Sequence, residues 1–177
     1  MTNLEKAVDR LLQIEGFISN VDYDPGGYTF EGISREYAPD WEGWKYVDKG
    51  DYKKASELVL KFYKERFWEP LKCSKIKSFE VAFNIFQIGV NRGIKHTIED
   101  VQIACNLLGS NLVVDGIIGP KTLEAVNSHN PVRFIEVFLG LQAKFYIEQA
   151  MEKDWAKKFL IGWLRKRVYE RIKEIYD

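Results

Sequence analysis

Cysteine and histidine are scarce in this chain of 177 residues, with two of each. Cys73 and Cys105 lie too far apart for a redox CxxC motif or a zinc-ligand pattern, so we expect two buried free thiols. The histidines, His96 and His129, have no serine and acid partners in a recognisable catalytic pattern. Phosphate-binding loops and dinucleotide-binding fingerprints are also missing. The sequence therefore disfavours nucleophilic triads, phosphoryl transfer and hydride transfer, and it predicts no cofactor.

The chain also lacks an excess of charge and any long apolar run. Its 26 basic and 26 acidic residues cancel, which leaves no global attraction to nucleic acid or to an anionic membrane. The basic stretch from Lys157 to Arg167 is typical of the solvated face of an amphipathic helix. No segment is apolar over the length of a bilayer, and residues 1–10 do not resemble a signal peptide. We therefore expect a chain that is made in the cytoplasm, with no nucleic-acid partner and no stable membrane insertion. A monomer is expected as well.

Core-forming residues, in contrast, are abundant, since 46% of the chain is hydrophobic and 14% is aromatic. Helical spacing of the apolar positions predicts helices over residues 4–14, 51–68, 78–91, 96–108, 120–126, 131–151 and 154–175. The helix over 78–91 is apolar nearly all round, as in a buried central helix. Glycine and proline punctuate residues 20–34, which predicts a loop or a short hairpin. We therefore predict a mainly α fold with a tight turn at 113–120 and a helical C-terminal part.

Acidic residues cluster around this Gly-rich loop, namely Glu15, Asp22, Asp24 and Glu31. Hydrolysis of a glycosidic bond needs a proton donor with a raised pKa and often a second carboxylate. We expect Glu15 at the end of the first helix, because Gly16 follows it. There the negative end of the helix dipole and the apolar neighbours raise the pKa of its carboxyl group. The alternative is an exposed glutamate at a helix end, which is common on protein surfaces.

The other polar candidates have structural interpretations as well. Asp24 opens the sequence Asp24–Gly27, a turn in which the aspartate bonds to its own backbone. Asp22 and Asp24 have the spacing of alternate calcium ligands, but no twelve-residue calcium loop follows, so we predict no metal site. Gln87 and Asn91 lie one turn apart on an apolar helix, where buried amides need partners. They either hold the loop in place or bind sugar hydroxyls and acetamides.

Aromatic residues are frequent near these acids, and a sugar ring can stack on such side chains. The aromatic residues concerned are Tyr23, Tyr28, Phe30, Tyr37, Trp41, Trp44 and Trp68. Ordinary core packing is the interpretation that we prefer for most of them. Trp68 is kept as a substrate-binding candidate.

Residues 15–34 resemble the opening of glycoside hydrolase family 108, whose pattern is Glu-Gly-Gly, a short gap and Asp-Pro-Gly-Gly-x-Thr-x-x-Gly-Ile-Thr. The chain reads Glu-Gly-Phe from residue 15 and Asp-Pro-Gly-Gly-Tyr-Thr-Phe-Glu-Gly-Ile-Ser from residue 24. Three further pieces resemble the family in order: Phe67-Trp68, Val90-Asn91-Arg92-Gly93 and Gly162-Trp163-Leu164-Arg165-Lys166-Arg167-Val168. The turn from Asp115 to Thr122 is similar to that of the family's C-terminal peptidoglycan-binding half. The resemblance thus covers nearly the whole chain.

The resemblance implies a lysozyme-like N-acetylmuramidase of the bacteriolytic, endolysin type, often encoded by phages or prophages. Glu15 matches the family's catalytic glutamate, which protonates the leaving glycosidic oxygen. Asp24, Thr29 and Asn91 match motif positions near that acid, and we assign them to substrate binding. Three positions depart from the pattern, and one of them, Ser34 in place of threonine, keeps the hydroxyl group. Phe17 replaces a second glycine, and Gln87 stands where an aspartate often precedes the Val-Asn motif by one turn.

Together these features predict a hydrolase of the β-1,4 bonds of peptidoglycan, with Glu15 as general acid. We expect Asp22, Gln87 and Trp68 to bind substrate as well. Residues 1–93 would form the catalytic part, and residues 94–177 a peptidoglycan-binding part packed with it as one unit. The partner is the glycan strand, and the chain acts on the wall after release or export. Two alternatives remain open, namely a non-catalytic peptidoglycan-binding module and a secretion-related factor that acts on a protein.

Overall fold

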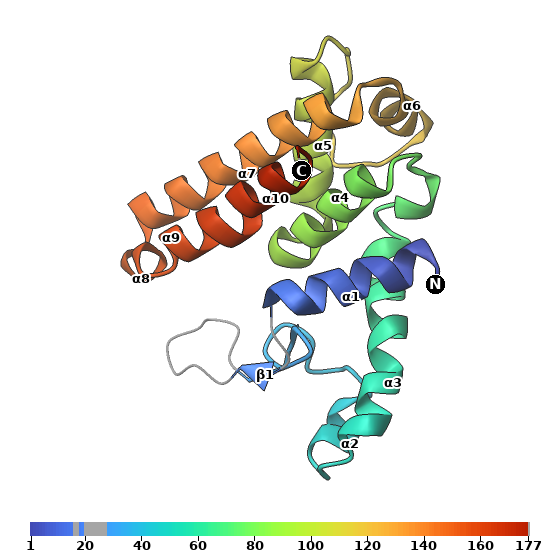
Figure 1. The fold of residues 1–177 in the computed structure, drawn as a ribbon, viewed down its shortest axis with the longest axis vertical. Helices are drawn as coiled ribbons and strands as arrows, with labels where there is room; N and C mark the ends of the chain where they lie inside the picture. The colour runs from blue at the N-terminus through green and yellow to red at the C-terminus, as the bar shows by residue number, and fades with distance from the viewer. Residues whose placement is uncertain (16–17, 20–27, 177) are drawn as a thin grey trace. The chain divides into compact units, whose positions relative to one another are not determined.

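The computed structural model describes residues 1–15, 18–19 and 28–176 of the chain (Figure 1). Its contacts divide the chain into two compact units, Met1–Glu69 and Pro70–Asp177. Helices dominate the described residues, whose one sheet has three strands of two residues each. None of the described helices is long and apolar enough to cross a membrane. The predicted mainly α fold class is confirmed.

The first unit is built on α1 (Asn3–Glu15) and α3 (Tyr52–Tyr63), which pack against each other. A reciprocal capping box starts α1. The Thr2 hydroxyl accepts the N–H of Glu5 at 3.2 Å, and the Glu5 carboxylate accepts the N–H of Thr2 at 2.6 Å. The end of α3 continues as the π-helix η1 (Lys64–Trp68). Both helices predicted for this part of the sequence are therefore present.

Three short antiparallel strands form the sheet of the first unit: β1 (Ile18–Ser19), β2 (Thr29–Phe30) and β3 (Ile33–Ser34). The central strand, β2, pairs with both of its neighbours. Glu31 and Gly32 form the two-residue turn between β2 and β3, with φ values of 46° and 74°. Positive φ at both turn residues matches the twist of the flanking strands. The predicted short hairpin is confirmed.

Aromatic rings fill the core of the first unit beside α2 (Trp44–Val47), which packs against α3. Trp41 stacks on Phe30 with 6.0 Å between ring centroids, and Trp44 meets Trp41 edge-on at 5.1 Å. Gly43 lies against the Trp41 ring, because a Cβ at this position would come within 2.2 Å of it. Trp41 is 7% exposed and Trp44 is 5% exposed. Core packing, the interpretation preferred for most of these aromatic residues, is thus confirmed for this pair.

The second unit centres on α4 (Phe79–Arg92), which packs against α5 (Ile94–Leu107) and α7 (Pro131–Glu152). Every residue from Val81 to Gly89 is buried, as predicted for a central helix. Gly93 ends α4 with a φ of 83°, and α5 begins at the next residue. The short helix α6 (Pro120–Ser128) packs against α5 and begins, as predicted, at its proline.

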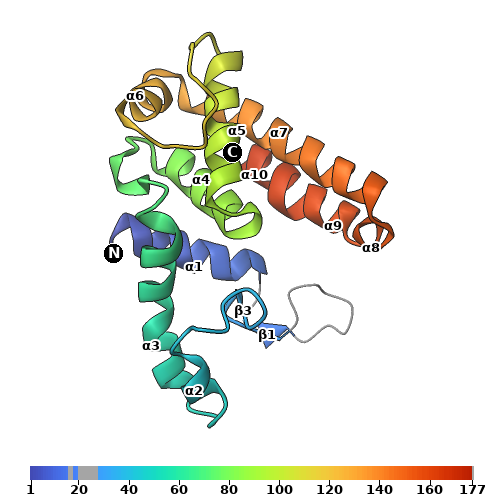
Figure 2. The same ribbon diagram turned by 180° about the vertical axis from the view of Figure 1, so that it is seen from behind.

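Short helical segments follow α7 and lie alongside it in both views (Figures 1 and 2). These segments are α8 (Asp154–Lys157), α9 (Leu160–Trp163), the π-helix η3 (Leu164–Tyr169) and α10 (Glu170–Glu174). The prediction of one continuous helix over 154–175 is therefore wrong. Phe159 stacks on Trp163 at 5.7 Å, and Trp155 packs edge-on against both rings. This aromatic contact stabilises a turn between α8 and α9.

The two cysteines are free and buried, as predicted. Cys73 begins the 3₁₀-helix η2 (Cys73–Lys75), and Cys105 lies in α5. Burial raises the pKa of both thiols, that of Cys105 to about 12. Both therefore remain protonated at neutral pH, a state in which cysteine is neither a nucleophile nor a metal ligand.

Candidate functional site

Glu15 is the last residue of α1, the position that the sequence predicted for it. Its side chain lies outside the described part of the structure, as do the residues Asp22 and Asp24. Ala7 and Leu11 of the same helix are both 0% exposed, so core packing holds α1 in place. The last carbonyl groups of a helix have no intrahelical partners and form the negative end of its dipole. Glu15 thus occupies a backbone position where a negative charge is disfavoured.

The β2–β3 hairpin, which carries Thr29, is fastened to α3 through Glu31. The hydroxyl of Ser56 donates a hydrogen bond to the Glu31 carboxylate, and the hydroxyl of Tyr63 donates to the Glu31 backbone oxygen at 2.8 Å. Glu31 is 4% exposed and Tyr63 is 0% exposed, so water cannot easily compete for these bonds. Thr29 is half-buried and pairs with Ser34 across the hairpin. The strand that carries a predicted substrate-binding residue is therefore fixed by α3.

Trp68 is the last residue of η1 and is 4% exposed. A ring buried to this degree offers little free face for stacking on a sugar. Its substrate-binding role stays a prediction, and its burial in this structure is that of a core residue.

Gln87 and Asn91 lie one turn apart on α4, as predicted. Asn91 donates a hydrogen bond from Nδ2 to the backbone oxygen of Gln87 at 2.8 Å. Gln87 is 0% exposed, and neither Oε1 nor Nε2 has a partner among the described residues. The expectation that a buried amide is paired is therefore wrong for Gln87 within this part of the chain. An unsatisfied buried polar group costs about 1–3 kcal/mol. The amide of Gln87, which is unpaired among the described residues, therefore lowers the stability of the fold.

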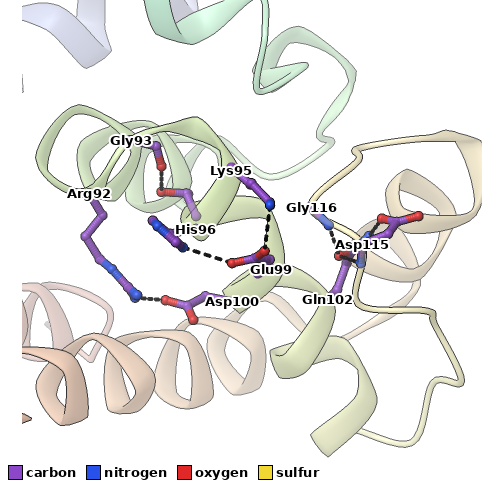
Figure 3. A network of polar contacts seen from close by, with 10 residues as sticks. Arg92, Gly93, Lys95, His96, Glu99, Asp100, Gln102, Asp115 and Gly116 are labelled. Carbon is purple, nitrogen blue, oxygen red and sulfur yellow. Dashed lines mark hydrogen bonds and ion pairs between the residues drawn. The ribbon is translucent and has the colours of Figure 1, made fainter.

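One glutamine side chain holds the loop between α5 and α6 (Figure 3). Oε1 of Gln102 accepts the backbone N–H groups of Asp115 and Gly116, both at 3.0 Å. Nε2 of Gln102 donates to Asp115 Oδ1 at 2.7 Å and to the backbone oxygen of Ile117 at 3.1 Å. The bonds from Gln102 and from the Ile117 N–H lower the pKa of the Asp115 carboxyl group. The tight turn predicted here is confirmed, and Gln102 is the residue that closes it.

The loop that Gln102 holds, residues 108–119, is called the fastened loop below. Apolar side chains on it and at the adjoining end of α5 are exposed to solvent. Leu107 and Ile117 are 65% exposed, Val113 is 78% exposed and Val114 is 44% exposed. Exposed apolar side chains that gather at one place mark sites of interaction more often than isolated ones do. The loop thus combines a fixed backbone with an apolar outer surface.

The junction of α4 and α5 carries an ion pair next to Asn91 (Figure 3). Arg92 pairs with Asp100 of α5, and the Arg92 guanidinium lies 4.0 Å from the ring centroid of Phe145 on α7. Desolvation raises the pKa of Asp100, although the charge of Arg92 opposes this effect. Arg92, which lies on α4, therefore contacts both α5 and α7.

Metal-ligating residues do not gather in the described ranges 1–15, 18–19 and 28–176. No group of three or more histidine, cysteine, aspartate or glutamate side chains there is placed to hold a metal ion. Asp22 and Asp24, considered as calcium ligands from their spacing, lie outside these ranges.

Sequence reasoning missed the role of Gln102 and the attachment of Glu31 to α3. A signal existed for Gln102, because this glutamine stands among the buried apolar residues of α5 and needs polar partners there. The partners themselves, 13 and 14 residues along the chain at Asp115 and Gly116, could not be read from helical periodicity. For Glu31 the sequence suggested only membership of an acidic cluster.

Comparison with known proteins gives two matches to family models. Residues 8–93 match the model described as glycosyl hydrolase 108, and residues 97–168 match a predicted peptidoglycan domain. The structure of SagA from Brucella abortus is similar, with a TM-score of 0.77 and 21% sequence identity. The match covers 98% of this chain and 94% of that one. At this identity the likeness shows a shared fold, and it agrees with the predicted fold class. A comparison with curated proteins finds no match.

Proposed function

Because residues 8–93 match the model of the glycosyl hydrolase 108 family and residues 97–168 match a predicted peptidoglycan domain, we propose that this chain binds and cuts the glycan strands of peptidoglycan. The observation that carries the proposal is the presence of both matches in one chain. A glycoside hydrolase needs a glycan, and the second match names a wall polymer that contains one.

The proposed reaction is hydrolysis of the β-1,4 bond between N-acetylmuramic acid and N-acetylglucosamine. Glu15 protonates the leaving oxygen, while water or a carboxylate such as Asp24 attacks or stabilises the oxocarbenium-like centre. The place of Glu15 at the C-terminal end of α1 supports this role, because it favours the protonated form. The residues proposed to bind substrate are Asp22, Asp24, Thr29, Trp68, Gln87 and Asn91.

The test is turbidity clearing of purified peptidoglycan, with the released sugars identified by mass. The wild type is compared with Glu15→Gln and with Glu57→Gln, a matched control at an exposed position of α3. We expect clearing with reducing N-acetylmuramic ends from the wild type and the control, and none from Glu15→Gln. Equal clearing by all three proteins would move the catalytic acid elsewhere.

A binding module without hydrolysis is the second candidate. The match over residues 97–168 and the exposed apolar surface of the fastened loop favour it. In the same assay it predicts that both wild type and Glu15→Gln sediment with the wall and that neither clears it. Sedimentation without clearing would therefore replace the hydrolase proposal with this one.

Catalysis is assigned in this proposal to residues 1–93 and wall binding to residues 94–177. The boundary between the two compact units falls at a different place in the sequence, between Glu69 and Pro70. Helix α4 accounts for the difference, because it lies within the hydrolase match and packs against α5 and α7 of the second unit. The proposed substrate lies outside the cytoplasm, so release or export precedes action on the wall.

A further inference from the structure

A cavity of about 370 Å³ opens in the first unit, and its lining residues include none of those named for the proposed reaction. This volume falls in the range of about 300–1,000 Å³ that is typical of small-molecule sites. Apolar side chains of Trp41, Leu58 and Phe62 form part of its lining, and charged residues form the remainder. The cavity lies between residues 40–42 and the helical stretch α3–η1, within a single compact unit.

Trp41, one of the lining residues, carries an unpaired hydrogen-bond donor. Its indole N–H is buried and has no acceptor among the described residues. The N–H of neighbouring Trp44, in contrast, donates to the backbone oxygen of Ala38 at 2.7 Å. Buried tryptophans usually pair this group. Phe30 stacks on the Trp41 ring and Gly43 lies against it, so the ring cannot easily rotate towards another acceptor.

The charged part of the lining contains both signs, and four of its five charged side chains form ion pairs, Glu65 being the fifth. Arg66 pairs with Asp40 and Lys61 pairs with Glu42, each at 3.3 Å. These side chains are between 46% and 71% exposed, and ion pairs at such positions separate at little cost. The three acidic and two basic side chains of the lining disfavour an anionic ligand, and their carboxylate and guanidinium groups can bond to hydroxyl groups.

We propose that this cavity binds an N-acetylated hexosamine as an additional glycan site. The acetamide methyl group packs against Leu58 and Phe62. The lining side chains shift to uncover the Trp41 N–H, which then donates a hydrogen bond to the acetamide oxygen. The ring hydroxyls meet the charged rim, whose ion pairs separate to admit the sugar. The inference rests on the proposed function, because the sugar is a unit of the same glycan.

The experiment follows the indole N–H signals of the ¹⁵N-labelled Glu15→Gln protein by NMR while N-acetylglucosamine is added. The chain has five tryptophans, and Trp41→Phe identifies the Trp41 signal by its loss. We expect this signal to move saturably with N-acetylglucosamine, and to move little with glucosamine or glucose, which lack the acetamide. Backbone signals of Leu58 and Phe62 report binding to Trp41→Phe itself. Its affinity should fall about tenfold, as expected for loss of one hydrogen bond.

Trp155→Phe is the matched control, since Trp155 lies in the other unit and is 39% exposed. It should leave the titration unchanged. Absence of a saturable shift at Trp41, an equal response to glucose, or undiminished affinity of Trp41→Phe would each overturn the proposal. Its failure is separable from failure of the proposed function, because wall clearing by the wild type is measured independently of this titration.

Discussion

Substitution of the buried Gln87 can separate the effect of its amide on stability from its effect on substrate binding. Neither of its polar atoms is paired with a described residue, so Gln87→Leu removes a desolvated amide and keeps its volume. We expect the free energy of unfolding in urea to rise by about 1–2 kcal/mol. If Gln87 binds substrate as proposed, wall clearing should fall in the same variant. Increased stability with undiminished clearing would remove Gln87 from the substrate-binding set.

Gln102 presents the opposite case, because its side-chain amide bonds to three residues of the loop. Gln102→Ala should lower the free energy of unfolding by about 3 kcal/mol, since several hydrogen bonds made by a buried side chain are lost together. Gln142→Ala is the matched control, because Gln142 is 0% exposed and its amide is unpaired among the described residues. The prediction fails if urea unfolding shows equal losses for the two variants.

Acid should loosen the same loop through Asp115. The folded state lowers the pKa of this carboxyl group, so its stabilising contribution is present above the ordinary pKa of aspartate. That contribution is lost as the pH falls through the lowered value of the folded state. We expect hydrogen exchange of the Gly116 and Ile117 amides, corrected for its intrinsic pH dependence, to increase over this range. Asp115→Asn should show a weaker dependence on pH there, and an unchanged profile in this variant would assign the effect to another group.

Local chemistry explains which single residues could be placed from the sequence. The end of α1 at Glu15 was predictable because a following glycine is a signal of helix termination within the chain itself. The lack of a partner for Gln87 among the described residues was not predictable, because it depends on which side chains distant segments bring to α4. The same holds for Gln102, whose partners belong to a loop beyond the end of its helix.

At the scale of elements, the attachment of the β2–β3 hairpin to α3 rests on the two hydroxyl donors to Glu31. Ser56→Ala removes the donor to a buried carboxylate, and Tyr63→Phe removes the donor to the backbone oxygen. Each should cost about 1–3 kcal/mol of unfolding free energy in urea. Glu57→Ala, exposed on the same helix, serves as control and should change it by less than about 0.5 kcal/mol. A similarly small loss in both hydroxyl variants would show that the hairpin is held by its apolar contacts instead.

Periodicity located most helices because each buries one apolar face, and α4 was recognisable as central because it is apolar nearly all round. The same rule failed over 154–175. The apolar spacing continues through Trp155, Phe159 and Trp163, but their rings pack on one another across a turn. A pattern that fits one long helix also fits helical segments that a turn at residues 158–159 separates and whose aromatic side chains meet across it.

At the scale of the whole molecule, the family match places α4 in the hydrolase region, whereas the contacts place it in the second compact unit. The match extends to residue 93, whereas the contacts place α4 in the unit that begins at Pro70. Its side chains Phe83 and Phe86 are 0% exposed, as are Phe134 and Phe138 of α7, against which α4 packs. A fragment that begins after α4 would therefore expose the buried faces of both α5 and α7.

This difference predicts the behaviour of two fragments. Residues 70–177 should fold on their own, with a cooperative thermal transition by circular dichroism, because they retain α4 and the core around it. Residues 94–177 should lack such a transition, because the apolar area that α4 covers is left in water. If the shorter fragment folds cooperatively and binds the wall, the boundary of the second unit lies at Gly93. If only the longer fragment does so, α4 is structurally part of the wall-binding unit although it belongs to the hydrolase match. Residues of the hydrolase region would then contribute to the stability of the wall-binding unit.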